Sequence, residues 1–194
     1  MLGPSTPSPG PGFAAALPRL MLVLGGARSG KSRFAEAAIE NSCGGGIYLA
    51  TATAGDAEMA ARISQHRARR GPRWLTIEEP LEIAARIAAE VRGDRPVLVD
   101  CLTLWLANLM AAGREPAAET ERLLASLVRA QGPVVLVANE VGLGIVPENA
   151  LARAFRDHAG RLNERAAAAA QRVVFMAAGL PLVLKDNAEA GAPR

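Results

Sequence analysis

The sequence contains few of the residues that mark several common classes of protein. It has two cysteines, Cys43 and Cys101, with neither CxxC spacing nor a histidine cluster nearby. No disulfide framework or zinc site is therefore indicated, and we expect both cysteines to be reduced, small hydrophobic residues of a cytoplasmic protein. The aromatic residues number seven, with Trp 2, Tyr 1 and Phe 4. This is too few for a platform on which nucleic-acid bases stack.

Long apolar runs and a strong net charge are also missing. No uninterrupted run reaches the roughly 20 apolar residues of a membrane helix. The stretch 13–24 is interrupted by Pro18 and Arg19, and no basic segment precedes it as in a signal peptide. The net charge is +3 and the arginines are scattered along the chain, which favours separate phosphate contacts over a nucleic-acid surface. We expect no membrane span and no nucleic-acid partner.

Composition divides the chain into one folded part and two ends. Residues 1–12 are dominated by Pro, Gly and Ser, which bury too little surface to offset the entropy of ordering. We expect a disordered leader over 1–18, a single domain over 19–186 and a flexible tail over 187–194. That domain length is sufficient for one sizeable core.

Short apolar runs alternate with helical patterns from Leu20 onward, which predicts an α/β fold with a mostly parallel sheet between helices. The runs are continuously apolar, as in strands buried on both faces. The predicted strands are Leu20–Leu24, Ile47–Thr51, Val97–Asp100, Val134–Ala138, Val173–Ala177 and Leu182–Lys185. The predicted helices are Lys31–Asn41, Asp56–Arg69, Leu81–Val91, Leu102–Ala112, Ala117–Ala130 and Asn149–Gln171.

The first predicted strand runs into a glycine-rich loop of the Walker A pattern and then into a helix. The loop consists of Gly25, Gly26, Ala27, Arg28, Ser29, Gly30, Lys31 and Ser32. Glycines let backbone N–H groups surround phosphate oxygens, Lys31 would neutralise the β and γ phosphates, and Ser32 would bind Mg²⁺. Strand, loop and helix agree, so we favour a phosphate loop over a chance turn. We expect a three-layer P-loop NTPase fold of the RecA-like type.

The predicted strand Val97–Asp100 ends in a carboxylate, the form of a Walker B element that holds Mg²⁺. The alternative is that Asp100 only caps the helix that follows. Together with the Walker A loop the magnesium role is favoured, and nucleotide binding follows. The use made of the nucleotide does not follow from these two motifs.

Two histidines and one long loop are further candidates. His66 lies between the apolar and the polar face of its predicted helix, near four arginines. It is either a half-exposed surface residue or a neutral imidazole placed as a nucleophile. His158 shares a predicted apolar face with Leu151 and Leu162, which favours a packed structural role. The loop 139–149 follows a strand and is either a substrate loop or an ordinary connector.

Several segments together resemble the adenosylcobinamide kinase/guanylyltransferase family. They are Gly25–Ser32, Tyr48–Thr51, Asp56–Arg70, Asp100–Thr103, Asn139–Asn149 and Phe155–Arg161. The resemblance implies that ATP or GTP phosphorylates adenosylcobinamide and that GTP then transfers GMP to that phosphate, with release of pyrophosphate. It implies that His66 carries the GMP, with Lys31 as the second catalytic residue. Beyond the P-loop, it implies nucleotide contacts at Ala50, Thr51, Ala52, Arg67, Ala68, Arg69, Arg70, Glu78 and Asp100.

The resemblance also implies a homotrimer, Mg²⁺ as cofactor at Ser32 and Asp100, and a corrinoid as the small-molecule partner. Two alternatives remain at this level. One is a P-loop kinase of another small alcohol, in which His66 is structural. The other is a RecA-like regulatory ATPase, for which the sequence offers no basic block or aromatic platform.

Overall fold

The computed structural model describes residues 16–52, 71–93 and 95–187. Their core is a seven-stranded sheet with the strand order β3-β2-β4-β5-β1-β6-β7. The strands are β1 (Leu20–Gly25), β2 (Gly46–Ala50), β3 (Trp74–Glu78), β4 (Val97–Asp100), β5 (Val134–Asn139), β6 (Arg172–Ala177) and β7 (Leu180–Asp186). The helices are α1 (Lys31–Cys43), α3 (Ile83–Glu90), α4 (Leu102–Ala111), α5 (Pro116–Arg129) and α6 (Ala150–Ala169).

The sheet is parallel except at one edge. Neighbouring strands from β3 to β6 pair in parallel, and β7 pairs antiparallel with β6. Every residue of β1 is buried, and so are Val134–Ala138 of β5, as expected of central strands covered on both faces. The mostly parallel α/β sheet predicted from the sequence is therefore confirmed.

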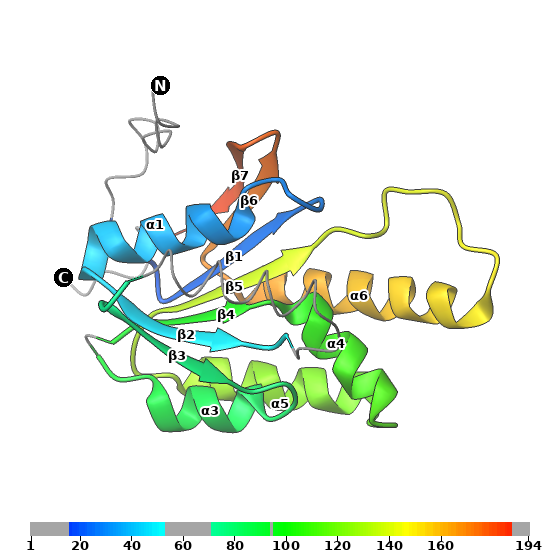
Figure 1. The fold of residues 1–194 in the computed structure, drawn as a ribbon, viewed down its shortest axis with the longest axis horizontal. Helices are drawn as coiled ribbons and strands as arrows, with labels where there is room; N and C mark the ends of the chain where they lie inside the picture. The colour runs from blue at the N-terminus through cyan, green and yellow to red at the C-terminus, as the bar shows by residue number, and fades with distance from the viewer. Residues whose placement is uncertain (1–15, 53–70, 94, 188–194) are drawn as a thin grey trace.

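Two apolar layers cover the sheet (Figure 1). On one face Ala35 and Ile39 of α1 pack with every second residue of the strands, beginning with Met21 and Val23 of β1. On the opposite face, the larger cluster joins the remaining strand positions to side chains of α3, α4, α5 and α6. Side chains alternate between the faces along each strand, so this division fixes which face every strand residue occupies.

The strand β3 is the main departure from the expected fold. The sequence predicted no strand at Trp74–Glu78, whereas these residues form the edge strand next to β2. The hairpin strand β7 begins two residues earlier than predicted, at Leu180. The predicted helix Asp56–Arg69 lies outside the described residues, as do residues 1–15 of the expected leader and residues 188–194 of the expected tail.

The β6–β7 turn contacts the loop that follows β1. Ala178 and Gly179 both have positive φ, at 51° and 82°, and form the tight turn between the two antiparallel strands. The backbone N–H of Gly179 donates to the carbonyl oxygen of Ser29 at 3.1 Å. The hairpin at one end of the chain therefore supports the glycine-rich loop near the other end.

Two expectations about individual residues are met only in part. Cys43 is exposed because it ends α1, one turn beyond Ile39, the last buried residue of that helix, whereas Cys101 is buried; neither forms a disulfide. His158 is only half-buried, and its supposed partner Leu151 is 70% exposed, because the first turns of α6 extend past the sheet (Figure 1).

Among the described residues, no helix is long and apolar enough to cross a membrane.

Candidate active site at the carboxyl edge of the sheet

The glycine-rich loop leaves β1 through a position that only glycine fits. Gly25 has a φ of +148°, and a Cβ there would lie 2.4 Å from the carbonyl oxygen of Met176 on β6. Gly30, at the start of α1, has a φ of +96°. The glycines therefore let the loop turn sharply at both ends, with Gly26, Ala27 and Arg28 exposed between them. The N-terminus of α1 follows directly, and its free N–H groups favour an anion.

Lys31 lies in the first turn of α1 and folds back over this loop. Its Nζ donates to the carbonyl oxygen of Gly26 at 2.5 Å and to Oγ of Ser29 at 3.4 Å. The side chain is 7% exposed. Burial lowers the pKa of Lys31, while the Cys101 thiol, once ionised at high pH, and the Asp100 carboxylate act in the opposite direction. The ammonium group is thus held inside the phosphate loop, close to the carboxylate at the end of β4.

Asp100 ends β4, and a neighbouring strand orients its carboxylate. The hydroxyl of Tyr48 on β2 donates to Oδ2 of Asp100 at 2.7 Å. Tyr48 is buried, and its ring meets the ring of Trp74 edge to face, with centroids 6.3 Å apart and an interplanar angle of 81°. Packing therefore holds the phenol in place. The second carboxylate oxygen, Oδ1, takes no part in this hydrogen bond.

The strand register brings the ends of three strands together. Ala50 of β2 stands opposite Glu78 of β3 on one side and Asp100 of β4 on the other. Side chains alternate between the two faces along a strand. Ala50, Trp74 and Leu98 pack in the apolar cluster on the face that carries α1. Glu78 and Asp100 lie an even number of residues after Trp74 and Leu98, so their side chains are on the same face as that of Ala50. The phosphate loop and these three residues thus share one face and one edge of the sheet.

A buried hydrogen-bond network fixes the loops beyond β2, β3 and β4. The Thr51 hydroxyl donates to the carbonyl oxygen of Cys101 and accepts from its N–H, both at 2.8 Å. From α4, the Asn108 amide donates to the carbonyl oxygens of Thr51 at 2.8 Å and Pro80 at 3.1 Å. Burial and the charge of Asp100 raise the pKa of Cys101 to about 11, so the thiol is neutral near pH 7. Asp100 then supplies the negative charge that faces Lys31.

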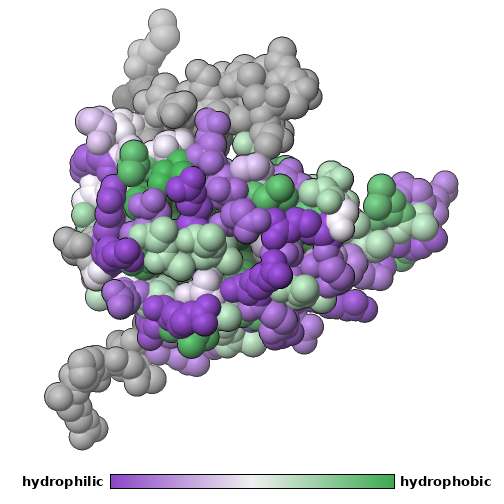
Figure 2. Space-filling model, turned by 90° about the horizontal axis from the view of Figure 1, so that it is seen from below, coloured by the Kyte–Doolittle hydropathy of each residue, from purple (hydrophilic) through white to green (hydrophobic). Residues whose placement is uncertain are grey.

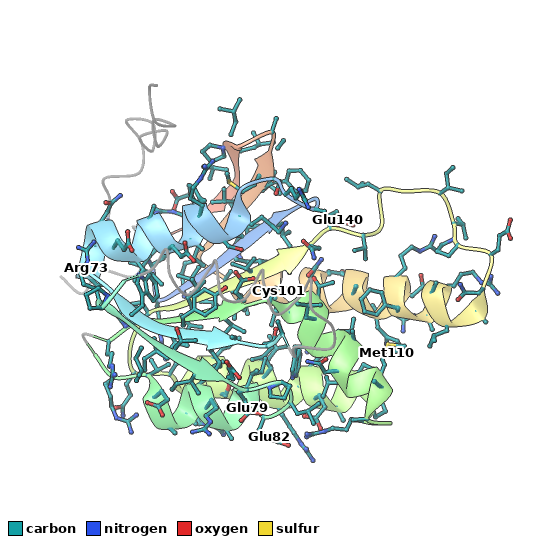
Figure 3. The ribbon with its side chains drawn as sticks, in the orientation of Figure 1. Arg73, Glu79, Glu82, Cys101, Met110 and Glu140 are labelled. Carbon is teal, nitrogen blue, oxygen red and sulfur yellow. The ribbon has the colours of Figure 1, made fainter. Side chains whose placement is uncertain are left out.

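The loop after β5 starts beside the phosphate loop. The Glu140 N–H donates to the carbonyl oxygen of Gly25 at 3.1 Å, and its side chain accepts from the N–H of Gly142 at 2.5 Å. Figure 3 shows Cys101 and Glu140 at the same edge of the sheet, while Arg73 lies at the opposite edge. The beginning of the loop 139–149 therefore belongs to this site.

The donor atoms at this edge fit a magnesium ion. Mg²⁺ prefers oxygen ligands and in nucleotide sites takes one or two protein ligands, with phosphates and water completing its shell. Ser32 offers a hydroxyl and Asp100 a carboxylate, both half-buried. No group of three or more His, Cys, Asp or Glu residues is placed to hold a metal within the described ranges. The hydroxyl of Ser32 and the carboxylate of Asp100 therefore suit Mg²⁺.

The structure thus gathers most of the residues expected from the sequence. The gathered residues are Gly25, Gly26, Ala27, Arg28, Ser29, Gly30, Lys31, Ser32, Ala50, Thr51, Ala52, Glu78 and Asp100. The remaining expected residues, His66, Arg67, Ala68, Arg69 and Arg70, lie outside the described residues. Sequence reasoning missed the orienting roles of Tyr48 and Asn108. Tyr48 sits in a strand otherwise made of Gly, Ile, Leu and Ala, and this isolated hydroxyl was the available signal.

Comparison with known proteins finds relatives along most of the chain. The family model described as "Cobinamide kinase / cobinamide phosphate guanyltransferase" matches residues 21–184. The "Bifunctional adenosylcobalamin biosynthesis protein CobP" of Pseudomonas aeruginosa is 49% identical over 168 residues, covering 86% of this chain and 97% of the relative. The protein CobU of Escherichia coli, described in the same words, is 42% identical over 181 residues, with coverages of 86% and 99%.

Solved structures support the fold alone. The flagellar accessory protein FlaH of Methanocaldococcus jannaschii matches with a TM-score of 0.53 at 10% identity, over 93% of this chain and 84% of that one. The RadB recombinase matches with a TM-score of 0.51 at 18% identity, over 83% and 76%. The expected P-loop NTPase fold is thereby confirmed. Because the family model spans most of the sequence and the relatives align over nearly their whole length, this chain belongs to the cobinamide kinase / cobinamide phosphate guanyltransferase family.

Proposed function

We propose that this protein phosphorylates adenosylcobinamide with ATP or GTP, and then transfers GMP from GTP to the new phosphate. The products are adenosylcobinamide-GDP and pyrophosphate, within cobalamin biosynthesis. Membership of the family over residues 21–184 is the observation that carries this proposal. The gathering of the phosphate loop, Lys31 and Asp100 at one edge of the sheet supports it, because both reactions need a held triphosphate.

In the kinase step this chain mainly positions the triphosphate and offsets its charge. We propose that the N–H groups of Gly26 to Ser32 and the ammonium of Lys31 bind the β and γ phosphates. The substrate hydroxyl oxygen gives its proton to solvent and bonds to the γ phosphorus as the bond from that phosphorus to the β-γ bridging oxygen breaks, and the nucleoside diphosphate leaves. Ser32 and Asp100 would hold Mg²⁺, which offsets phosphate charge when bound. The Tyr48 hydroxyl keeps the Asp100 carboxylate in place.

In the guanylyl step we propose that an imidazole nitrogen of His66 attacks the α phosphorus of GTP. The bond from that phosphorus to the α-β bridging oxygen breaks and pyrophosphate leaves. A phosphate oxygen of the phosphorylated corrinoid then takes the GMP group from the imidazole. The negative charge that builds up on pyrophosphate is offset by Lys31, which already lies inside the phosphate loop. Two displacements replace one direct transfer between anions.

Labelled GTP tests this proposal. Incubation of the native chain with Mg²⁺ and GTP labelled at the α phosphate should leave an acid-labile, alkali-stable label on the protein. Peptide mass analysis should locate one GMP on His66, and His66→Ala should carry none. His158→Ala is the matched control and should keep the label. A native chain that phosphorylates a small alcohol but takes up no label would support the simpler kinase instead.

We further propose that the chain acts as a homotrimer in the cytoplasm. Its loop 140–149 and the start of α6 form an arm that projects from the body (Figure 1), and Figure 2 shows apolar side chains on this projection. Leu143, Ile145, Val146 and Leu151 are 82%, 97%, 58% and 70% exposed. Such a cluster is typical of a surface that a subunit covers. Light scattering should give three times the chain mass of 20.2 kDa, and a monomeric mass would contradict the trimer.

Cell fractionation tests the proposed location. It should recover the chain with the cytoplasmic proteins, not with the membranes.

A further inference from the structure

Asn139, the last residue of β5, has an unusually well-fixed backbone. Its N–H donates to the hydroxyl of Thr103 on α4 at 2.7 Å, and its carbonyl oxygen accepts from the amide of Asn163 on α6 at 3.2 Å. Thr103 and Asn163 are 8% and 7% exposed. Two buried polar side chains from two helices thus hold the backbone of one residue. Its own half-buried side chain is not used in either bond.

The face of the sheet that Asn139 occupies follows from its strand. Val135 and Val137 of β5 pack in the cluster that includes α1, and Asn139 has the same parity. Its side chain therefore lies on the α1 face, as does that of Asp100. Asp100 pairs in register with Val137, so Asn139 stands two residues farther along the strand direction.

The neighbouring strands place Asn139 between two groups of the proposed phosphate site. In the sheet β5 lies between β4, which ends in Asp100, and β1, which leads into the phosphate loop. Asn139 is paired with Gly25, the first residue of that loop. Lys31 folds back to Gly26 in the same loop. A group that lies between this loop and Asp100 therefore faces the phosphate end of a bound nucleotide.

We propose that the carboxamide of Asn139 donates a hydrogen bond to the terminal phosphate of the bound triphosphate. This proposal rests on the proposed function, since it assumes a nucleotide in the loop. A carboxamide suits the position because it is a neutral donor, whereas a carboxylate there would repel the phosphate. The anchors from Thr103 and Asn163 set the donor before the nucleotide arrives. Asn139 thereby distinguishes a nucleoside triphosphate from its diphosphate product.

The test compares the affinities of two nucleotides, measured by calorimetry with Mg²⁺ present. Native protein, Asn139→Ala and Asn139→Asp are titrated with a non-hydrolysable GTP analogue and with GDP. A hydrogen bond to a charged group corresponds to roughly a tenfold to hundredfold difference in affinity. Asn139→Ala should therefore bind the GTP analogue at least about tenfold more weakly and bind GDP as the native chain does. Asn139→Asp should show the larger loss for the GTP analogue.

The matched control is Asn187→Asp, which makes the same chemical change away from the proposed site. The N–H of Asn187 donates to the carbonyl oxygen of Gln171, which directly precedes β6 and so lies at the amino end of the parallel strands. It should leave both affinities unchanged. An equal loss of both affinities in Asn139→Ala, or no loss, would overturn the proposed contact. Labelling of His66 by GTP, measured on the same native preparation, separates the two proposals. If the label forms while Asn139→Ala keeps the native preference for triphosphate, only the Asn139 contact is refuted.

Discussion

The hydroxyl of Tyr48 lies 2.7 Å from Oδ2 of Asp100, so that β2 orients the carboxylate at the end of β4. Tyr48→Phe removes this hydrogen bond and keeps the ring that packs on Trp74. Loss of a partner that orients a metal ligand typically lowers metal affinity by about 10-fold or more. We expect the Mg²⁺ concentration for half-maximal activity to rise about tenfold, while saturating Mg²⁺ restores most of the turnover. An unchanged Mg²⁺ dependence would contradict this role of Tyr48.

Lys31→Ala should abolish most of the activity. The ammonium group is the charged donor within the phosphate loop, and removal of a donor that stabilises developing charge typically lowers turnover by about 100-fold or more. We expect losses of this size in both half-reactions, measured as corrinoid phosphate formed and as GMP bound to protein. Lys185→Ala is the control, because Lys185 donates to the carbonyl oxygens of Ala167 and Ala168 at the end of α6. It should keep native turnover.

Thr51→Val should destabilise the fold. The substitution keeps the shape of the side chain but leaves the N–H and carbonyl groups of Cys101 without their buried partner. Each unsatisfied buried group costs about 1–3 kcal/mol, so we expect the free energy of unfolding to fall by about 2–4 kcal/mol in urea titrations. Thr51→Ser retains the hydroxyl and should lose clearly less. A loss in Thr51→Val no larger than the loss in Thr51→Ser would contradict the role of these two hydrogen bonds.

The two cysteines should differ in reactivity. Cys43 is exposed, whereas Cys101 is 6% exposed and has a pKa of about 11. Since the thiolate is the reactive form, a thiol reagent at pH 8 should modify one equivalent rapidly in the native chain and the second only after denaturation. Cys43→Ser should lose the rapid phase. Rapid modification of native Cys43→Ser, in which Cys101 is the one remaining cysteine, would contradict the burial of Cys101.

Glu79 should stabilise the chain only above acidic pH. Burial acts to raise the pKa of its carboxyl, but hydrogen bonds from the N–H groups of Glu82 and Leu81, and from Arg86, outweigh it and lower the pKa below 4.5. The stabilisation is therefore present above about pH 4.5 and is lost as the pH falls through the folded-state pKa. Glu79→Ala should lower the unfolding free energy by about 1 kcal/mol at pH 7, and the difference should shrink toward pH 3. A difference independent of pH would contradict this assignment.

The sequence predicted the central strands because they are buried on both faces and therefore read as continuous apolar runs. The search for continuous apolar runs missed β3, because β3 is not buried on both faces. Trp74 is buried, but Leu75 is 47% exposed and Glu78 is exposed, because this strand lies at the edge of the sheet. Its apolar residues alternate weakly, and Thr76 and Glu78 interrupt the run. A test for continuous hydrophobicity does not detect such a strand.

The conformation of the glycine-rich loop was predicted as far as local motifs reach. The phosphate loop is one contiguous segment in which strand, glycines and helix follow each other, so its chemistry is visible in the sequence. The hydrogen bonds from Tyr48 to Asp100 and from Asn108 to Thr51 and Pro80 join residues that are 52, 57 and 28 positions apart. These pairings depend on strand order and register, which no local pattern specifies. His66 stays a prediction from family resemblance.

The contact between Gly179 and Ser29 has a consequence for the order in which the protein forms during synthesis. β1 is made first, but its two neighbours in the sheet are β5 and β6, and the turn that supports its glycine-rich loop comes after β6. A ribosome-bound chain that ends before residue 170 has made all of the loop but not the strand and turn beside it. We therefore expect the proposed nucleotide to protect the chain only after β6 and this turn have been made, and deletion of the β6–β7 hairpin should remove that protection.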